Sequence, residues 1–189
     1  GKKKDCQNRS VVTTPTEIVK YMVDKTLSKV CDGKTPSEIL DISVADIACG
    51  SGIFLEEAFA YLQDYCVQWY ICNGQTDHLI ETGIDLYKLP LQEKKDILCS
   101  CIYGIDIDIH AVEVAKFSLL IKLIEDETAP SVSEVVPILP DLGDNIQFGN
   151  SLVSQTELNG ISGANHQMME IAPFDWSTIN NGCGFDVII

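Results

Sequence analysis

Apolar side chains recur every three or four positions along three segments of the chain, residues 18–30, 55–69 and 111–123. This spacing places them on one face of an α-helix, so each segment is expected to form an amphipathic helix that buries that face. The first helix is expected to begin at a capping box over residues 14–17, with a proline at its first position, and to stop at Gly33.

Short apolar runs between and after these helices predict strands over residues 42–46, 101–106, 145–148 and 184–189. Because strands and helices alternate, we expect an α/β fold of the Rossmann-like class, with a doubly wound, mostly parallel sheet and helices on both faces. In such sheets, ligands bind outside the carboxyl ends of the strands. The residues that follow each predicted strand are therefore the candidates for a binding site.

We expect one domain over residues 13–189, preceded by a flexible basic arm over residues 1–12. Within the domain, residues 74–98 have no clear pattern and are expected to form a helical insertion, whose last helix begins at Pro90. The final predicted strand runs to the end of the chain. Since a domain seldom ends on a buried strand, we expect the chain to be part of a longer protein.

The formal net charge of −15 is unevenly distributed along the chain. Through Lys34 there are eight basic and four acidic residues, whereas ten acidic residues and no basic residue follow Lys122. A surface with such an excess of acidic side chains repels a phosphate backbone. Contacts with a nucleic acid duplex are therefore expected only from the N-terminal arm or from chain beyond this one.

Other features of the composition exclude some classes of protein. No apolar run approaches the ~18 residues that a membrane-spanning helix needs, and the start lacks the pattern of a signal peptide. We therefore expect a cytoplasmic protein with no membrane partner. The eight cysteines are scattered, and the three histidines do not stand in zinc-ligand spacing with them. This favours reduced thiols over disulfides or a metal site.

A glycine turn follows the first predicted strand, in the sequence Asp46-Ile47-Ala48-Cys49-Gly50-Ser51-Gly52. Gly50 and Gly52 can adopt positive φ angles, which lets the backbone approach a ligand closely. The helix predicted beyond the turn has free N–H groups at its N-terminus, and these bind anionic or polar groups. The pattern is typical of a turn that holds a cofactor.

A second acidic residue, Asp106, stands at the end of the next predicted strand, where nucleoside-binding sheets have a carboxylate that binds both ribose hydroxyls. Asp46 and Asp106 are 60 residues apart, which exceeds the ~20 of the dinucleotide fingerprint, so an insertion must separate them. The carboxyl ends of parallel strands share one edge of a sheet. We therefore expect the two carboxylates to reach opposite ends of a single ligand.

With three further motifs, these segments resemble the adenine-specific N6 DNA methyltransferases of restriction-modification systems, including the modification halves of large type II enzymes. The resemblance implies the class I methyltransferase fold, here truncated, with S-adenosylmethionine as cofactor. Ile47 stands where the family has proline. The matching segments are Thr14-Pro15-Thr16-Glu17-Ile18-Val19, the turn from Asp46 to Gly52, Tyr103-Gly104-Ile105-Asp106-Ile107-Asp108, Gly149-Asn150-Ser151-Leu152 and Phe185-Asp186-Val187-Ile188-Ile189.

The resemblance also implies a place for each part of the cofactor. Asp46 would bind the cationic end and Asp106 the ribose diol. Asn150, where family members commonly have Asp, would accept a hydrogen bond from the adenine amine, with Ile107 and Phe148 as apolar walls for the ring. The carboxylate and the rest of the methionine part would be bound by the glycine turn and the start of the first helix, at Ala48, Cys49, Gly50, Gly52 and Thr14.

Catalysis in this family depends on an Asn-Pro-Pro-Tyr motif, which the chain does not contain and which is expected beyond Ile189. No catalytic residue is therefore assigned within the chain, and methyl transfer by this part alone should be negligible. By resemblance, the full protein methylates double-stranded DNA in a bacterial or archaeal cell and contacts it through parts absent here. A fused or associated restriction nuclease is a candidate partner.

Other functions remain open on the residues alone. A nicotinamide-dependent oxidoreductase would share the sheet and the acid after a strand, but Leu55 stands where the third glycine of Gly-x-Gly-x-x-Gly would be. A hydrolase would need a Gly-x-Ser-x-Gly turn, which Cys49-Gly50-Ser51-Gly52 does not supply. A scaffold or interaction module that holds a cofactor, without chemistry of its own, fits the same residues.

Overall fold

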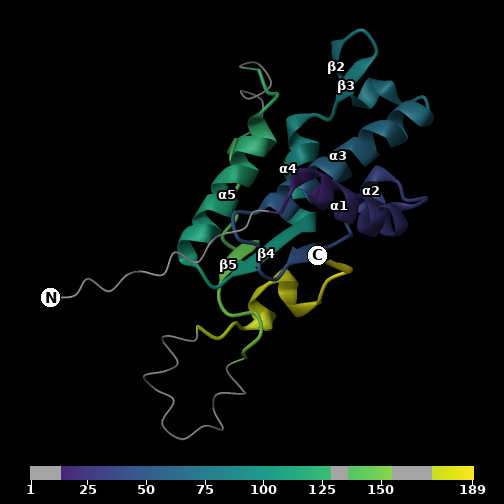
Figure 1. The fold of residues 1–189 in the computed structure, drawn as a ribbon. Coiled ribbons are helices and arrows are strands. Elements are labelled where there is room, and N and C mark those ends of the chain that lie inside the picture. The colour runs from purple at the N-terminus through teal and green to yellow at the C-terminus, as the bar shows by residue number, and fades with distance from the viewer. Residues whose placement is uncertain (1–13, 129–135, 155–171) are drawn as a thin grey trace, which may run out of the picture.

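A parallel sheet of four strands lies at the centre of the computed structural model, which describes residues 14–128, 136–154 and 172–189 (Figure 1). Its strands lie side by side in the order β5-β4-β1-β6. Each corresponds to one of the predicted strands, and the Rossmann-like α/β fold class is confirmed. The arm expected over residues 1–12 lies outside the described residues. The strands are β1 (Val44–Asp46), β4 (Ile102–Asp106), β5 (Ile146–Phe148) and β6 (Val187–Ile188).

The main core lies between the α-helices and one face of the sheet. Side chains alternate between the two faces of a strand, and Val44, Ile102 and Ile146 point to this face and are fully buried. The three amphipathic helices predicted from the apolar spacing are confirmed as α1, α3 and α5. Buried side chains reach this core from α1 (Thr16–Cys31), α2 (Pro36–Ile39), α3 (Ile53–Cys72), α4 (Leu91–Cys101) and α5 (Ile109–Ile124).

A smaller aromatic cluster covers the second face of the sheet. Ala45, Tyr103 and Ile105 point to this face and pack with Phe174 and Ile179. Among the described residues, the cover comes from the segment 172–186, which includes two short 3₁₀-helices, η2 (Trp176–Thr178) and η3 (Asn180–Gly182). The α-helices expected on both faces are therefore found on one face only in this part of the chain, because the long helices all pack into the main core. The sheet is thus buried on both faces, as its continuous apolar strands require.

The start of α1 differs from the prediction. Pro15 is its N-cap residue and no side chain caps the helix, so the capping box expected over residues 14–17 is wrong. The helix begins one residue after the proline, whose carbonyl accepts hydrogen bonds from the amides of Ile18 and Val19. A capping box occurs instead at α2, where the Glu38 amide donates to Thr35 Oγ1 and the Thr35 amide donates to the Glu38 carboxylate.

The insertion over residues 74–98 is helical only in part. A 3₁₀-turn, η1 (Thr76–His78), leads into an antiparallel hairpin of β2 (Ile80–Gly83) and β3 (Leu86–Lys88), and α4 follows Pro90 as predicted. The hairpin is short and its register shifts within β2, so its alternation is too brief to stand out in the sequence. The strand predicted to begin at residue 101 begins one residue later, because Cys101 is the last residue of α4. A continuous apolar run does not show where a helix ends and a strand begins.

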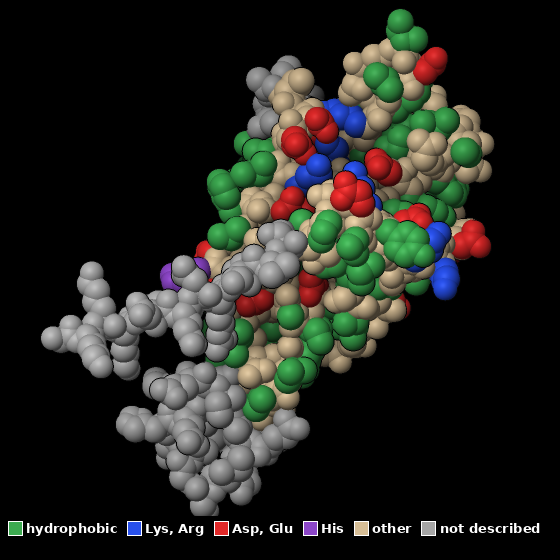
Figure 2. All heavy atoms as spheres, viewed as in Figure 1, with side chains coloured by type: hydrophobic (Ala, Val, Ile, Leu, Met, Phe, Trp, Pro, Cys, Tyr) green, Lys and Arg blue, Asp and Glu red, His purple; other side chains and the backbone are tan. Residues whose placement is uncertain are grey.

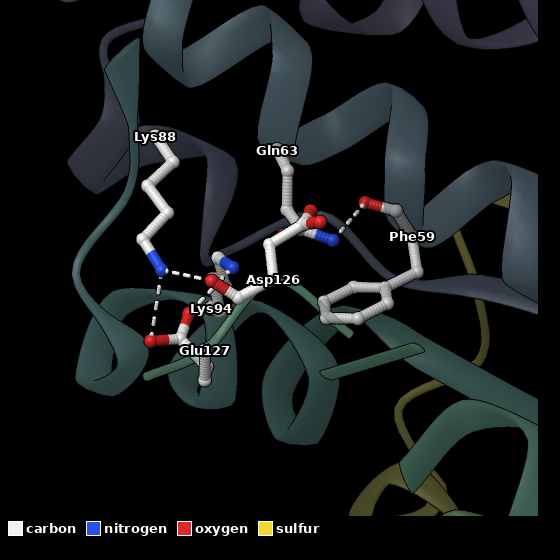
Figure 3. Close-up of polar contacts among 6 residues, drawn as sticks. All are labelled: Phe59, Gln63, Lys88, Lys94, Asp126 and Glu127. Atoms are coloured by element: carbon white, nitrogen blue, oxygen red, sulfur yellow. Dashed lines mark hydrogen bonds and ion pairs between the residues drawn. The ribbon is translucent and has the colours of Figure 1, made fainter. Parts of the chain in front are cut away.

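A buried ion-pair network attaches this hairpin to the helical layer (Figure 3). The carboxylate of Glu127 lies 2.7 Å from Lys94 Nζ and 3.0 Å from Lys88 Nζ, and its side chain is 1% exposed. Lys88 also donates to the backbone carbonyl of Asp126. Figure 2 shows acidic and basic side chains gathered where the hairpin meets the end of α5. One carboxylate thus connects the end of β3, helix α4 and the residues after α5.

We expect Glu127→Ala to lower the free energy of unfolding by about 3–5 kcal/mol, because two lysine ammonium groups would lose their common carboxylate where water has little access. Glu125→Ala is the matched control, since its pair with Lys122 at 2.7 Å is exposed to solvent and should contribute little. Urea denaturation of both variants measures the difference. Equal losses would show that the Glu127 network does not stabilise the fold.

Candidate functional site

The candidate site lies at the carboxyl edge of the sheet, where the strand order reverses. From β1 the chain passes to β4 on one side, and β6 is added on the other, so β1 stands at the switch point of the sheet. Crevices at such points are the usual ligand sites of doubly wound folds. Asp46 ends β1, and Ile189 follows β6 and donates its amide to the Ala45 carbonyl at 2.9 Å.

A hollow of about 290 Å³ opens at this point. It brings together five of the predicted cofactor residues from the start of the described chain and from the glycine turn. The other lining residues were not predicted, although those of α3 could have been, because they directly follow the turn. They are Met22 of α1, Ser51 of the turn, Ile53 and Phe54 of α3, and Ile189. The predicted residues that line it are Thr14, Asp46, Ala48, Cys49 and Gly50.

The glycine turn has the backbone conformation that its sequence predicts. Gly50 has a φ of +53° and Gly52 a φ of +88°, and Gly52 is the N-cap of α3 without any side-chain cap. The first amides of α3 therefore have no partner within the helix, and their residues Ile53 and Phe54 line the hollow. Gly52 itself does not line the hollow. An added Cβ there would lie 3.1 Å from the Cβ of Ala115, so this glycine permits close packing of α3 against α5.

The electrostatics of the hollow are dominated by a buried carboxylate. Asp46 is buried and accepts a hydrogen bond from the Ala48 amide at 3.0 Å. Burial raises the pKa of Asp46 above the ordinary aspartate value, the Ala48 hydrogen bond opposes this, and the neighbouring charge of Asp106 raises it further. Burial, with the charges of Asp46 and Asp106, raises the pKa of the Cys49 thiol to about 12. Cys49 is therefore a neutral lining group rather than a nucleophile.

Asp106, at the end of β4, is connected directly to the glycine turn. Its Oδ2 accepts a hydrogen bond from the Gly50 amide at 2.7 Å, and its Oδ1 accepts one from the Asp108 amide at 2.8 Å. Each carboxylate oxygen can accept a further hydrogen bond, so both remain available to a diol. The sequence gives no sign of the contact with Gly50, which joins residues 56 positions apart.

The residues predicted for the adenine lie along the same edge but outside the hollow. Ile107 is 54% exposed and Phe148 is 45% exposed, and Phe148 pairs with Asp106 in the register of β5 against β4. The backbone amide of Asn150 donates to the Ala172 carbonyl at 2.6 Å, and the side-chain Oδ1 of Asn150 accepts from the Leu152 backbone amide at 3.1 Å. The edge therefore has a hollow with a buried carboxylate at β1 and an exposed apolar surface at β4 and β5.

Within the ranges that the structure describes, no helix has the length and apolar character needed to cross a membrane. No cluster of three or more histidine, cysteine or acidic side chains in the same ranges is arranged to hold a metal ion. The seven cysteines found there all have free thiols.

Comparison with known proteins gives matches to restriction-modification enzymes. Residues 100–189 match the family described as Eco57I restriction-modification methylase. The chain is 43% identical over 182 residues, 96% of its length and 17% of the relative, to the type II restriction enzyme and methyltransferase RM.Eco57I of Escherichia coli. It is 34% identical over 122 residues to a Methanocaldococcus jannaschii protein whose assignment as a type II restriction enzyme and methyltransferase is provisional. The second match covers 65% of the chain and 9% of that relative, so the chain spans only a small part of each.

We expect Gly52→Ala to lower the free energy of unfolding more than Gly50→Ala does. Both substitutions put a Cβ on a residue in the left-handed region, at about 1–2 kcal/mol each. A Cβ at Gly52 would also crowd Ala115, whereas nothing lies within 4 Å of one at Gly50. Urea denaturation of the two variants is the measurement, and a smaller loss for Gly52→Ala would contradict the close packing of α3 on α5.

Proposed function

We propose that the chain is the cofactor-binding part of a DNA methyltransferase of a restriction-modification system, because residues 100–189 match the family described as Eco57I restriction-modification methylase and the chain is 43% identical to a restriction enzyme and methyltransferase. We further propose that its cofactor is S-adenosylmethionine and that the full protein methylates N6 of adenine. One observation carries the cofactor proposal. The glycine turn with Asp46 and the strand end with Asp106 meet at one edge of the sheet, through the Gly50 to Asp106 hydrogen bond.

The hollow suits the methionine part of the cofactor. A buried carboxylate, Asp46, is available to an α-ammonium group, whose positive charge would relieve the repulsion between Asp46 and Asp106. The uncapped amides at the start of α3 are available to the α-carboxylate, because a helix N-terminus attracts negative charge. Thr14, which also lines the hollow, is available for one further hydrogen bond.

The rest of the edge suits an adenosine. Asp106 would accept from the two ribose hydroxyls with the lone pairs that its backbone partners leave free. Ile107 and Phe148 are exposed beside it, and an adenine ring between them would remove apolar surface from water. Asn150 Oδ1 has one lone pair beyond its bond with Leu152, which the adenine amine could use.

These residues would bind and orient the donor but not activate the acceptor. When bound, the cofactor supplies an electrophilic methyl group. An exocyclic adenine amine is a weak nucleophile. The Asn-Pro-Pro-Tyr motif that activates this amine in the family would follow Ile189. Because Ile189 lines the hollow, residues attached to it would begin beside the donor. We propose that the target base is brought to this point out of its duplex.

The proposed partners follow from charge and from the named relatives. A net charge of −15 is unsuited to binding a phosphate backbone, so we propose that double-stranded DNA is held by other parts of the full protein. The relatives are named as both restriction enzyme and methyltransferase, and we propose a fused nuclease here as well. We place the protein in the bacterial or archaeal cytoplasm.

We expect calorimetric titration to show binding of S-adenosylmethionine and S-adenosylhomocysteine and weaker binding of a nicotinamide dinucleotide. Asp106→Ala should weaken the binding of both nucleosides by about 1–3 kcal/mol, through loss of charged hydrogen bonds to the ribose. Asp108→Asn is the control, because it keeps an N-cap acceptor for α5 and should leave affinity unchanged. A preference for the dinucleotide would overturn the proposed function.

The affinity for S-adenosylhomocysteine should fall when the pH is lowered from about 7 to about 4. Protonation of Asp46 removes its attraction for the α-ammonium group, so the affinity is full above the pKa of Asp46 and is lost below it. Because this pKa is raised, the affinity is lost at a higher pH than it would be with an exposed aspartate. Asp46→Asn should bind more weakly and with a flatter pH profile. An unchanged profile in this variant would show that the ammonium group lies elsewhere.

A further inference from the structure

The segment Ala172–Phe174 lies along the turn that carries Asn150. The backbone amide of Asn150 donates to the Ala172 carbonyl at 2.6 Å, and the backbone amide of Phe174 donates to the Val153 carbonyl at 2.9 Å. Between these bonds, Asn150 and Pro173 form a parallel bridge. The turn is therefore held at its beginning and at its end by one short piece of backbone that follows it in the chain.

The side chain of Phe174 fixes how close this segment comes to the turn. An added Cβ at Gly149 would lie 2.7 Å from Phe174 Cδ2 and 3.1 Å from Phe174 Cβ. The aromatic ring thus lies directly against the backbone of Gly149, at a distance that leaves no room for a larger residue. Any shift of this ring would be transmitted to Gly149 and from there to Asn150.

Phe174 is itself held by the second face of the sheet. It is 3% exposed and packs with Tyr103 and Ile105 of β4. Its ring meets that of Trp176 edge to face, with centroids 5.1 Å apart. Because Asp106 ends the same strand, the ring is fixed to the element that carries the candidate ribose carboxylate.

The other contacts of the turn point toward the same strand end. The Gly149 amide donates to the backbone carbonyl of Asp106 at 2.9 Å. Asn150 Oδ1 accepts from the Leu152 amide, which determines which end of the side-chain amide carries the oxygen. The remaining lone pair of Oδ1 and the amide N–H groups are thus held at a set position relative to Asp106.

From these contacts we propose that Phe174 is a positioning residue, which holds Asn150 at the nucleoside site and thereby sets the preference of that site for adenine. The inference rests on the proposed function, because it takes Asn150 as the partner of the adenine edge. Phe174 acts through Gly149 and the backbone of the turn. A polar group rejects the wrong base only when it is held in place, because a mobile one adjusts to either base.

The test compares S-adenosylhomocysteine with S-inosylhomocysteine, in which a carbonyl replaces the adenine amine and the neighbouring ring nitrogen carries a proton. Calorimetry gives both dissociation constants for the unaltered protein, for Phe174→Leu and for Gly149→Ala. We expect the adenine preference, expressed as the ratio of the two constants, to fall by about 3- to 10-fold in each variant, which is the effect of one misplaced hydrogen bond.

Two controls separate positioning from a general loss of stability. Ile179→Ala removes a buried side chain of the same aromatic cluster, and Ile179 makes no hydrogen bond to the turn. It should lower the free energy of unfolding and leave the preference unchanged. Asn150→Ala should remove the preference, and adding Phe174→Leu to it should then have no further effect, because the two residues act in series.

The outcomes distinguish this inference from the one on which it rests. If the unaltered protein binds neither nucleoside, the proposed function fails. If it binds S-adenosylhomocysteine with a preference that Phe174→Leu and Gly149→Ala both leave unchanged, Phe174 does not position Asn150. An equal loss of preference in Ile179→Ala would also overturn the inference, since any loosening of the cluster would then suffice.

Discussion

The hydrogen bond from the Gly50 amide to the Asp106 carboxylate is the contact on which the geometry of the site depends. It joins the turn after β1 to the end of β4, and it is reinforced by the bond from the Cys49 amide to the Ile105 carbonyl at 3.0 Å. Gly50 can take part because it has a positive φ, which turns its amide toward the neighbouring strand. The hollow beside Asp46 and the exposed edge beside Asp106 therefore have a fixed relation to each other.

This arrangement puts two carboxylates near each other, which is unfavourable in the absence of a ligand. The structure limits the repulsion with backbone amides, since Ala48 donates to Asp46, and Gly50 and Asp108 donate to Asp106. The pKa of Asp46 is nevertheless raised, mainly by burial and to a smaller extent by the charge of Asp106. A ligand with a cationic end and a diol would satisfy both groups, and this is the physical argument for the adenosyl amino acid that we propose as cofactor.

The two faces of the sheet support the two halves of the candidate site. On the helical face, Gly52 lets α3 pack against Ala115 of α5, and this sets the direction of the helix N-terminus at the hollow. On the other face, Phe174 fixes the turn of Asn150 against the end of β5. The Lys88, Lys94 and Glu127 network lies outside both and attaches the inserted hairpin to α4 and to the end of α5.

The sequence by itself determined the alternation of helices and strands, the glycine turn and the strand-end position of Asp106, because these depend on side-chain periodicity and on local backbone preferences. It misplaced the capping box at α1 and missed the hairpin within residues 74–98, where short local patterns allow more than one conformation. Only the tertiary structure decided that Gly50 binds Asp106, that Ile189 lines the hollow and that Phe174 packs on Gly149. These contacts join residues distant in the chain, and they follow from strand order and packing distance, which no local pattern encodes.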